Sequence, residues 1–141
     1  SAVKNNSRMH IPVFGNGDVN SPERAVEMRD RYGLDGAMIG RASIGNPWFF
    51  NQVKHYFKTR AHLEKPSIQD RVALAKRHLE MSIGWKGDVL GVLETRRHYT
   101  NYFKGIKNFK LYRTAMVTAN DAQEVFNTFD RVLEEVIDPA W

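Results

Sequence analysis

Two short apolar runs near the start of the chain each lead into a glycine-rich turn. The runs cover residues 11–14 and 36–40. Apolar runs of this length, bounded by glycine, are typical of buried β-strands. A helical pattern lies between them, and two strands joined through a helix form a parallel pair. The pattern therefore predicts one βαβ unit.

The helices on either side of the second strand have recognisable start signals. Ser21 suits an N-cap, Pro22 suits the first helical position, and Gly33 suits the end of that helix. A further helix is predicted from Asn46, because apolar residues recur at helical spacing after it. Residues 58–66 are polar and have no clear period, so we interpret them as a linker.

Only helical patterns follow the linker. Ser67 with Asp70 three residues later resembles a capping box, which predicts the start of a helix. Apolar stripes then predict about four helical segments, with an interruption across residues 84–91 and a last segment that opens near residues 120–121. We expect a compact bundle of helices over residues 67–137, and no strand.

Composition narrows the class of protein. The chain has 141 residues, 42% of them hydrophobic and 26% charged, which is enough apolar material for a packed core. Cysteine is absent, which excludes disulfides and thiolate chemistry. No apolar run approaches the roughly 20 residues of a membrane helix, and no signal-peptide pattern opens the chain. The five histidines show no metal-ligand spacing. We therefore expect a cytoplasmic protein without metal and without a membrane partner.

The excess positive charge is confined to one segment, residues 96–113. The chain carries 21 basic and 16 acidic residues, a formal net charge of +5. Residues 96–113 contain six of the basic residues and no Asp or Glu, so the rest of the chain is close to neutral. Such a block is the electrostatic footprint of a polyanion-binding face, and RNA is the partner it favours over a passive solvated surface. The candidate RNA-binding residues are Arg96, Arg97, Lys104, Lys107, Lys110 and Arg113.

Aromatic rings interleave with these cations, and two interpretations of the rings stay open. Planar rings can stack on exposed bases or on ribose. Helical spacing instead favours a core position for Tyr99, Tyr102 and Phe103.

Both glycine turns suit a phosphate group. Glycine lets the backbone approach a ligand closely and aim N–H groups at an anion, and the guanidinium of Arg41 can bind phosphate oxygens through two hydrogen bonds. Phosphate sites of (β/α)8 barrels are frequently built from two such loops in succession. Three alternatives remain: the glycines only form turns, Arg41 is a structural ion-pair partner, and Asp18 braces its loop.

Four motifs in order resemble tRNA-dihydrouridine synthases. Pro12–Asp18, Asp35–Arg41 and Gly45–Phe49 are similar to the final barrel segments of that family. Arg96-Arg-His-Tyr99 followed by Tyr102–Gly105 is similar to the signature of its helical domain. The resemblance covers nearly the whole chain from about residue 3.

The resemblance implies a mainly α chain with a small α/β part. Residues 1–60 would be the last two βα units of a (β/α)8 TIM barrel, and residues 61–141 a C-terminal helical-bundle domain that binds tRNA. The family enzymes take hydride from NADPH onto FMN and reduce the C5=C6 bond of uridine. The residues that match the family's FMN-phosphate site are Asn16, Gly17, Asp18, Gly40 and Arg41.

The chain departs from the family in what it does not contain. The resemblance implies six earlier βα units and a general-acid cysteine, and the sequence contains neither. We therefore expect a truncated piece of an oxidoreductase that is inactive by itself, with no catalytic residue of its own and with self-association through its incomplete barrel part. Two other functions stay open: a stand-alone basic helical RNA-binding module, and another TIM-barrel oxidoreductase that binds FMN or a different phosphate.

Overall fold

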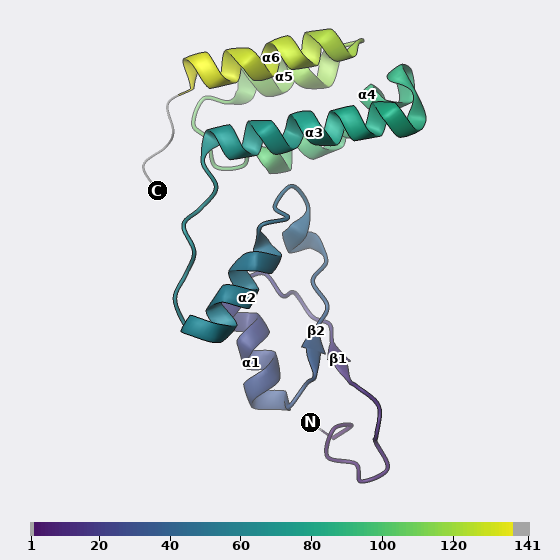
Figure 1. The fold of residues 1–141 in the computed structure, drawn as a ribbon, viewed down its shortest axis with the longest axis vertical. Helices are drawn as coiled ribbons and strands as arrows, with labels where there is room; N and C mark the ends of the chain where they lie inside the picture. Colours follow the sequence, from purple (N-terminus) through teal and green to yellow (C-terminus); the bar gives the residue numbers. More distant parts are fainter. Residues whose placement is uncertain (1, 137–141) are drawn as a thin grey trace. The chain divides into compact units, whose positions relative to one another are not determined.

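The chain folds into two units. In the computed structural model, which describes residues 2–136, these units are Ser1–Glu64 and Lys65–Trp141 (Figure 1). The sequence predicts that the bundle ends at residue 137, which lies outside the described residues. Residue 1, the start of the first expected domain, and residue 141, the end of the second, also lie outside them. The structure is mostly helical with one small parallel sheet, which confirms the predicted mainly α chain with a small α/β part; its place in a TIM barrel stays a prediction.

The first unit contains the predicted βαβ arrangement. Strand β1 (Phe14–Gly15) pairs in parallel with β2 (Gly36–Ala37), and α1 (Pro22–Tyr32) connects them. The register places Phe14 opposite Gly36. A Cβ on Gly36 would lie only 2.5 Å from the ring of Phe14, so the close approach of the two strands depends on this glycine.

Both strands are shorter than the predicted runs of residues 11–14 and 36–40. Backbone pairing extends one step beyond each end, from Asp35 N–H to Val13 O (3.0 Å) and from Met38 N–H to Gly15 O (2.7 Å). The N–H of Val13 donates to the carboxylate of Asp35 (2.7 Å) instead of to a strand. A ladder of two strands has no third strand to hold the rest of each run extended.

Helix α1 has the predicted caps. The Ser21 hydroxyl accepts a hydrogen bond from the backbone N–H of Arg24 (3.2 Å), and Gly33 adopts the left-handed conformation that ends the helix. Helix α2 (Phe49–Thr59) begins three residues later than the predicted start at Asn46. Asn46 precedes a proline, and a residue in that position is disfavoured in helical conformation.

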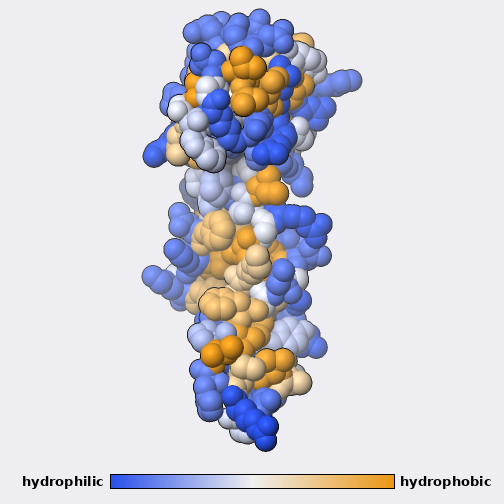
Figure 2. All heavy atoms as spheres, turned by 90° about the vertical axis from the view of Figure 1, so that its right-hand side faces the viewer, coloured by the Kyte–Doolittle hydropathy of each residue, from blue (hydrophilic) through white to orange (hydrophobic). Residues whose placement is uncertain are grey.

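Helices α1 and α2 pack together, while much of the sheet side of the unit stays uncovered. The core of this unit consists of Val19, Ala25, Met28, Phe49 and Val53. Large apolar side chains nevertheless remain exposed here (Figure 2); they are Val3, Ile11, Phe14, Met38, Ile44, Phe50 and Leu63. Exposed apolar faces were expected for an incomplete barrel part, and self-association through them stays a prediction.

The second unit contains four helices and, within its described residues, no strand. They are α3 (Ile68–Lys86), α4 (Asp88–Tyr102), α5 (Lys110–Thr118) and α6 (Ala122–Glu135). The predicted start of α3 is confirmed, because Ser67 and Asp70 form a reciprocal capping box. The predicted interruption across residues 84–91 is confirmed only at Gly87: α3 continues through Gly84 to Lys86, and α4 begins at Asp88 and includes Gly91. A single glycine inside a helix is tolerated at modest cost.

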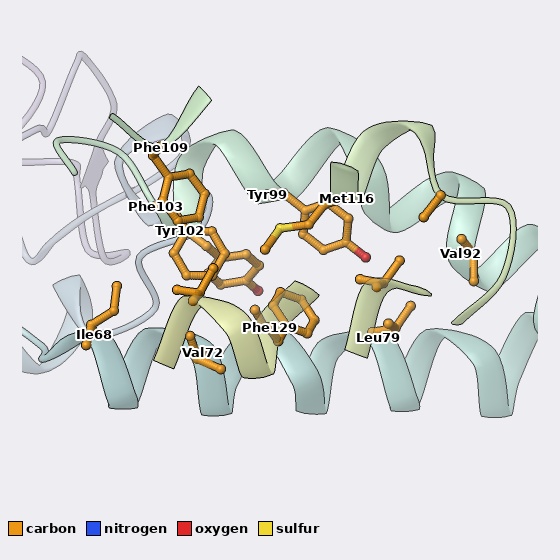
Figure 3. Close-up of a cluster of buried hydrophobic side chains, with 14 residues drawn as sticks. Ile68, Val72, Leu79, Val92, Tyr99, Tyr102, Phe103, Phe109, Met116 and Phe129 are labelled. Atoms are coloured by element: carbon orange, nitrogen blue, oxygen red, sulfur yellow. The ribbon is translucent and has the colours of Figure 1, made fainter. Parts of the chain in front are cut away.

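The core of the helical unit is built around large rings from α4 and α6 (Figure 3). Tyr99 and Phe129 are fully buried and meet edge to face, with their ring centroids 5.7 Å apart. Leu79 of α3 and Met116 of α5 are also fully buried, so all four helices contribute to one core.

Helices α3 and α4 approach each other closely at Gly91. A Cβ at this position would lie 2.7 Å from both the Cα and the backbone N of Ile83.

We expect Gly91→Ala to lower the free energy of unfolding by about 1–3 kcal/mol, because backbone atoms must move apart. Gly84→Ala is the matched control. Its Cβ would meet nothing within 4 Å, so this substitution should leave stability unchanged or raise it by up to about 1 kcal/mol. Urea unfolding followed by circular dichroism measures the free energy of unfolding of both variants. Equal losses of stability in Gly91→Ala and Gly84→Ala would contradict the packing argument.

Candidate functional site

The two predicted phosphate loops meet at one hollow of the first unit. Four of the five candidate cofactor-binding residues line it, namely Asn16, Asp18, Gly40 and Arg41. Gly17 lies between two of them but does not line the hollow. The volume is about 720 Å³, and the remaining walls come from Val19, Asn20, Met38 and Ala42. The parallel pairing of β1 with β2 causes this convergence, because both loops follow the carboxyl ends of the strands.

The backbone of the first loop takes conformations that favour small or polar residues. Gly17 has a φ of 152° and Asp18 a φ of 41°. Glycine reaches such values without steric cost, and Asp is among the few other residue types that tolerate the left-handed region. The loop therefore turns sharply away from β1, which places Asn16 and Asp18 at the hollow.

Arg41 and Asp18 form an ion pair beside the hollow. Arg41 opens the short 3-10 helix η1 (Arg41–Ser43), and both charged side chains are largely exposed. An exposed pair of this kind contributes little to stability. The structural ion-pair role that the sequence left open for Arg41 is thus observed, and the guanidinium stays accessible to an anion from the solvent.

The donor groups around this hollow fit a phosphate. Arg41 contributes a guanidinium, and Asn16 can contribute an amide N–H. Within residues 2–136, the backbone N–H groups of Gly40 and Arg41 have no protein acceptor. The Asp18 carboxylate accepts hydrogen bonds only, so it cannot donate to a phosphate and would compete with it for the donors of Arg41.

A second hollow, of about 480 Å³, lies on the helical unit between α4 and α5. Lys104, Lys110 and Arg113 line it, so three of the six candidate RNA-binding residues converge there. We call this surface the basic hollow. The segment between the helices makes its concave shape, because Gly105 and Asn108 both have positive φ. The other lining residues are Thr100, Phe103, Gly105, Ile106, Asn108 and Phe109.

The other three candidate cations lie elsewhere. Lys107 and Arg97 are exposed but do not line the basic hollow. Arg96 is half-buried, and its guanidinium donates to the carbonyl oxygen of Ala119 between α5 and α6. Arg96 therefore has a structural contact that charge patterning alone did not reveal.

The cations of the basic hollow have no acidic partner within residues 2–136. No carboxylate among the described residues forms an ion pair with Lys104, Lys110 or Arg113. Other cations of the same unit are paired, as Lys76 is with Asp130 and Arg131 with Glu135. Three cations without a described carboxylate partner thus converge where the surface of this unit is concave.

The aromatic residues of the basic segment are mostly core residues, as their helical spacing predicted. Tyr99, Tyr102 and Phe103 are buried, and so is Phe109, whose ring stacks on that of Phe103 at 4.6 Å. Burial leaves these rings no open face for a base. Their role is to hold the segment that positions the cations.

A hydrogen bond between α3 and α4 fixes the end of this ring cluster. The Tyr102 hydroxyl lies 2.9 Å from Nδ1 of His78. Burial raises the pKa of Tyr102, and burial together with the nearby Arg97 and Lys86 lowers the pKa of His78. Both side chains are therefore neutral at pH 7, and the hydroxyl can donate to the imidazole.

Sequence reasoning missed some lining residues of the basic hollow. Asn108 lies there with a φ of 57°, and Thr100 contributes a hydroxyl. Asn is a turn signal, since it tolerates the left-handed conformation, but it does not identify a binding surface.

The described residues contain neither a membrane-spanning helix nor a metal-binding cluster. No helix in the described part of the chain is long and apolar enough to cross a membrane. Residues 2–136 also contain no group of three His, Cys, Asp or Glu side chains arranged to hold a metal ion.

Comparison with known proteins gives a consistent result. The family model described as Dihydrouridine synthase (Dus) matches residues 1–138. The chain is 37% identical over 113 residues to tRNA-dihydrouridine synthase B of Pseudomonas putida, an alignment that covers 80% of this chain and 34% of that protein. It is 35% identical over 111 residues to a probable tRNA-dihydrouridine synthase of Rickettsia conorii, with 79% and 34% covered. A probable tRNA-dihydrouridine synthase 1 of Synechocystis is 31% identical over 123 residues, with 87% and 34% covered. The chain thus spans about a third of the length of these relatives.

Proposed function

The chain belongs to the dihydrouridine synthase family, and we propose that it supplies the FMN-phosphate site and a tRNA-binding surface of an enzyme that reduces uridine in tRNA. One observation carries the cofactor part of this proposal. Asn16 and Asp18 come from one loop, and Gly40 and Arg41 come from a second loop that begins 22 positions after Asp18. All four residues line a single hollow, with a guanidinium at its edge.

Each part of the phosphate hollow has a separate task in this proposal. The Arg41 guanidinium and the backbone N–H groups of Gly40 and Arg41 would bind the FMN phosphate, because charge-assisted hydrogen bonds to phosphate are strong and directional. Gly17 would supply the positive φ that turns the first loop toward the hollow. The bound flavin would supply hydride transfer from NADPH to the C5=C6 bond of uridine.

The basic hollow would bind the phosphate backbone of tRNA. Lys104, Lys110 and Arg113 present positive charge that no described carboxylate neutralises. Phosphate contacts of this kind position a nucleic acid without reading its sequence. Selection of a particular uridine would therefore depend on residues around the reacting base.

The chain itself is expected to show no reductase activity. It contains no cysteine, so the general acid implied by the family resemblance is not among its residues. We also expect weak FMN binding by the purified chain, because the described hollow offers groups for a phosphate but few walls for the flavin ring. A stoichiometric flavin absorbance in the purified chain would contradict this.

The flavin site is tested by Arg41→Ala in a full-length enzyme that contains this segment. Loss of the guanidinium should lower the flavin content after purification and the dihydrouridine content of tRNA in cells that depend on this enzyme. A bidentate Arg–phosphate contact contributes about 1.5–3 kcal/mol, so FMN affinity should fall roughly tenfold to a hundredfold. Absorbance of the purified protein and a titration with FMN measure this. Unchanged flavin affinity would remove the phosphate assignment.

Two further variants separate the phosphate role of Arg41 from a purely structural one. Asp18→Asn removes the ion pair but keeps the loop backbone, since Asn also tolerates positive φ. If Arg41 binds phosphate, flavin affinity should be at least as high as before, because a competing carboxylate is gone. If Arg41 only braces the loop, Asp18→Asn should weaken flavin binding as much as Arg41→Ala does. Arg60→Ala breaks the exposed pair with Asp30 outside the hollow and controls for loss of a surface charge.

A further inference from the structure

The turn between α3 and α4 carries a cluster of exposed apolar side chains. Figure 2 looks onto this end of the helical unit and shows apolar residues gathered there. Trp85 exposes 83% of its surface and Val89 68%, and Leu90 exposes more than half. We call this surface the hairpin patch; it consists of Met81, Trp85, Val89, Leu90 and Leu93.

The local fold brings these residues to one place. Met81 and Trp85 lie one turn apart on α3, and Val89 and Leu93 lie one turn apart on α4. The helices touch backbone to backbone where Gly91 meets Ile83, and the Ser82 hydroxyl donates to the carbonyl oxygen of Gly91 (3.2 Å). None of the patch residues belongs to the core of the unit or packs against it.

The patch is large for the surface of a monomer. The five side chains expose between 44% and 83% of their surface, which together amounts to an area on the order of 600 Å². Single apolar patches on monomeric proteins reach about 300–600 Å², and the large ones commonly have a function. Two such patches pressed together would bury about 1,200 Å² in total, the lower end of the range of specific interfaces.

The charges around the patch are balanced. Lys86 pairs with Glu94 and lies over the Trp85 ring, with its Nζ 5.0 Å from the ring centroid. Asp88 and Arg97 are the neighbouring charges on α4. A rim with both signs does not attract a polyanion, in contrast to the basic hollow. It does suit a two-fold pairing, in which each positive group can face the negative group of an identical surface.

From the size of the patch and its balanced rim, we propose that the hairpin patch is the surface through which two copies of this chain dimerise. The α3–α4 turn of one copy packs against the α3–α4 turn of the other, and Trp85 of each copy is buried between Val89 and Leu90 of its partner. Exposed aromatic residues are typical anchors of such interfaces. This self-association is independent of the incomplete sheet of the first unit and of any bound cofactor.

Sedimentation velocity of the purified chain over a range of concentrations tests the proposal. The unaltered chain should shift from monomer to dimer as concentration rises. The double variant Val89→Glu with Leu90→Glu should stay monomeric, because dimerisation would bury each new carboxylate without a partner against the Trp85 ring of the other copy. Both positions are exposed, so the helical content of the variant should equal that of the unaltered chain, and circular dichroism checks this. The matched control is Ile11→Glu with Phe50→Glu, which adds the same charge to exposed apolar positions of the first unit.

Each result decides the matter. A dimer in the unaltered chain and the control, with a monomeric Val89/Leu90 variant, supports the proposal. A monomeric unaltered chain overturns it, as does a Val89/Leu90 variant that still dimerises. If only the Ile11/Phe50 variant becomes monomeric, the copies meet through the first unit instead. If the Val89/Leu90 variant loses tRNA affinity while the unaltered chain stays monomeric, the patch contacts nucleic acid and the proposal is wrong.

Discussion

Replacing Lys104, Lys110 and Arg113 together by glutamine is expected to lower the affinity of the chain for tRNA about a hundredfold at low salt. Each contact between an exposed cation and a phosphate contributes roughly 1 kcal/mol, and every 1.4 kcal/mol corresponds to a tenfold change. The three side chains line one concave surface, so a single stretch of phosphate backbone can meet all of them. Filter binding at low ionic strength gives the ratio of the two affinities.

The salt dependence of binding supplies an independent readout. Each phosphate contact releases condensed counterions, and the logarithm of the affinity falls linearly with the logarithm of salt concentration. Loss of three contacts should make that slope shallower by about two to three units. A nonspecific loss of folded protein would lower the apparent affinity but would leave the slope unchanged.

A triple variant with the same loss of charge controls for net charge alone. Lys76→Gln, Arg77→Gln and Arg131→Gln remove three cations from the same unit but outside the basic hollow. Two of these cations are paired with carboxylates, so they should contribute little to the attraction of tRNA. Equal losses of affinity in the two triple variants would contradict a localised binding surface and favour a diffuse attraction by net charge.

Local signals were sufficient to predict the framework of the fold. Ser21, Ser67 and Asp121 cap three helices with their side chains, and these caps depend only on residues three positions away. The two apolar runs bounded by glycine predicted the βαβ unit for a similar reason. Strand length was not predictable, because it depends on how many neighbouring strands hold each run extended.

Helix α5 carried no usable pattern. It has only nine residues, and Met116 is the only buried residue within it. One buried position defines no period, so the hydrophobic pattern could not locate this helix. The cations of the basic hollow were identified from charge alone. Their convergence on one surface could not be predicted from charge, because it depends on the turn that links α4 to α5.

The candidate phosphate site was more predictable than the basic hollow. Asp18 and Arg41 follow successive strands of a parallel sheet, and the carboxyl ends of such strands meet at one edge. Their ion pair was foreseen only as an alternative for Arg41. Its formation depends on side-chain rotamers and on the positive φ of Asp18, neither of which a sequence pattern specifies.

Truncation of Phe129 should cause the largest loss of stability in the helical unit. This side chain is fully buried, and its ring contacts those of Tyr99, Phe103 and Phe126 at centroid distances of 5.7, 6.2 and 6.4 Å. Phe129→Ala removes these contacts and leaves a cavity, so the free energy of unfolding should fall by about 3–5 kcal/mol. Domains of this size are stabilised by only about 5–15 kcal/mol, so the variant should lie close to its unfolding threshold.

The matched control for Phe129 lies one turn earlier on the same helix. Phe126 is only partly buried, so Phe126→Ala should cost about 1–2 kcal/mol, although it removes the same atoms. Urea unfolding monitored by helical circular dichroism compares the two variants in the whole chain. Because α6 joins the core made by α3, α4 and α5, the loss in Phe129→Ala should appear as a lower midpoint for all four helices together. A variant in which α6 alone melts, or in which Phe126→Ala is the more destabilised, would show that the helical unit is not organised around the Phe129 ring.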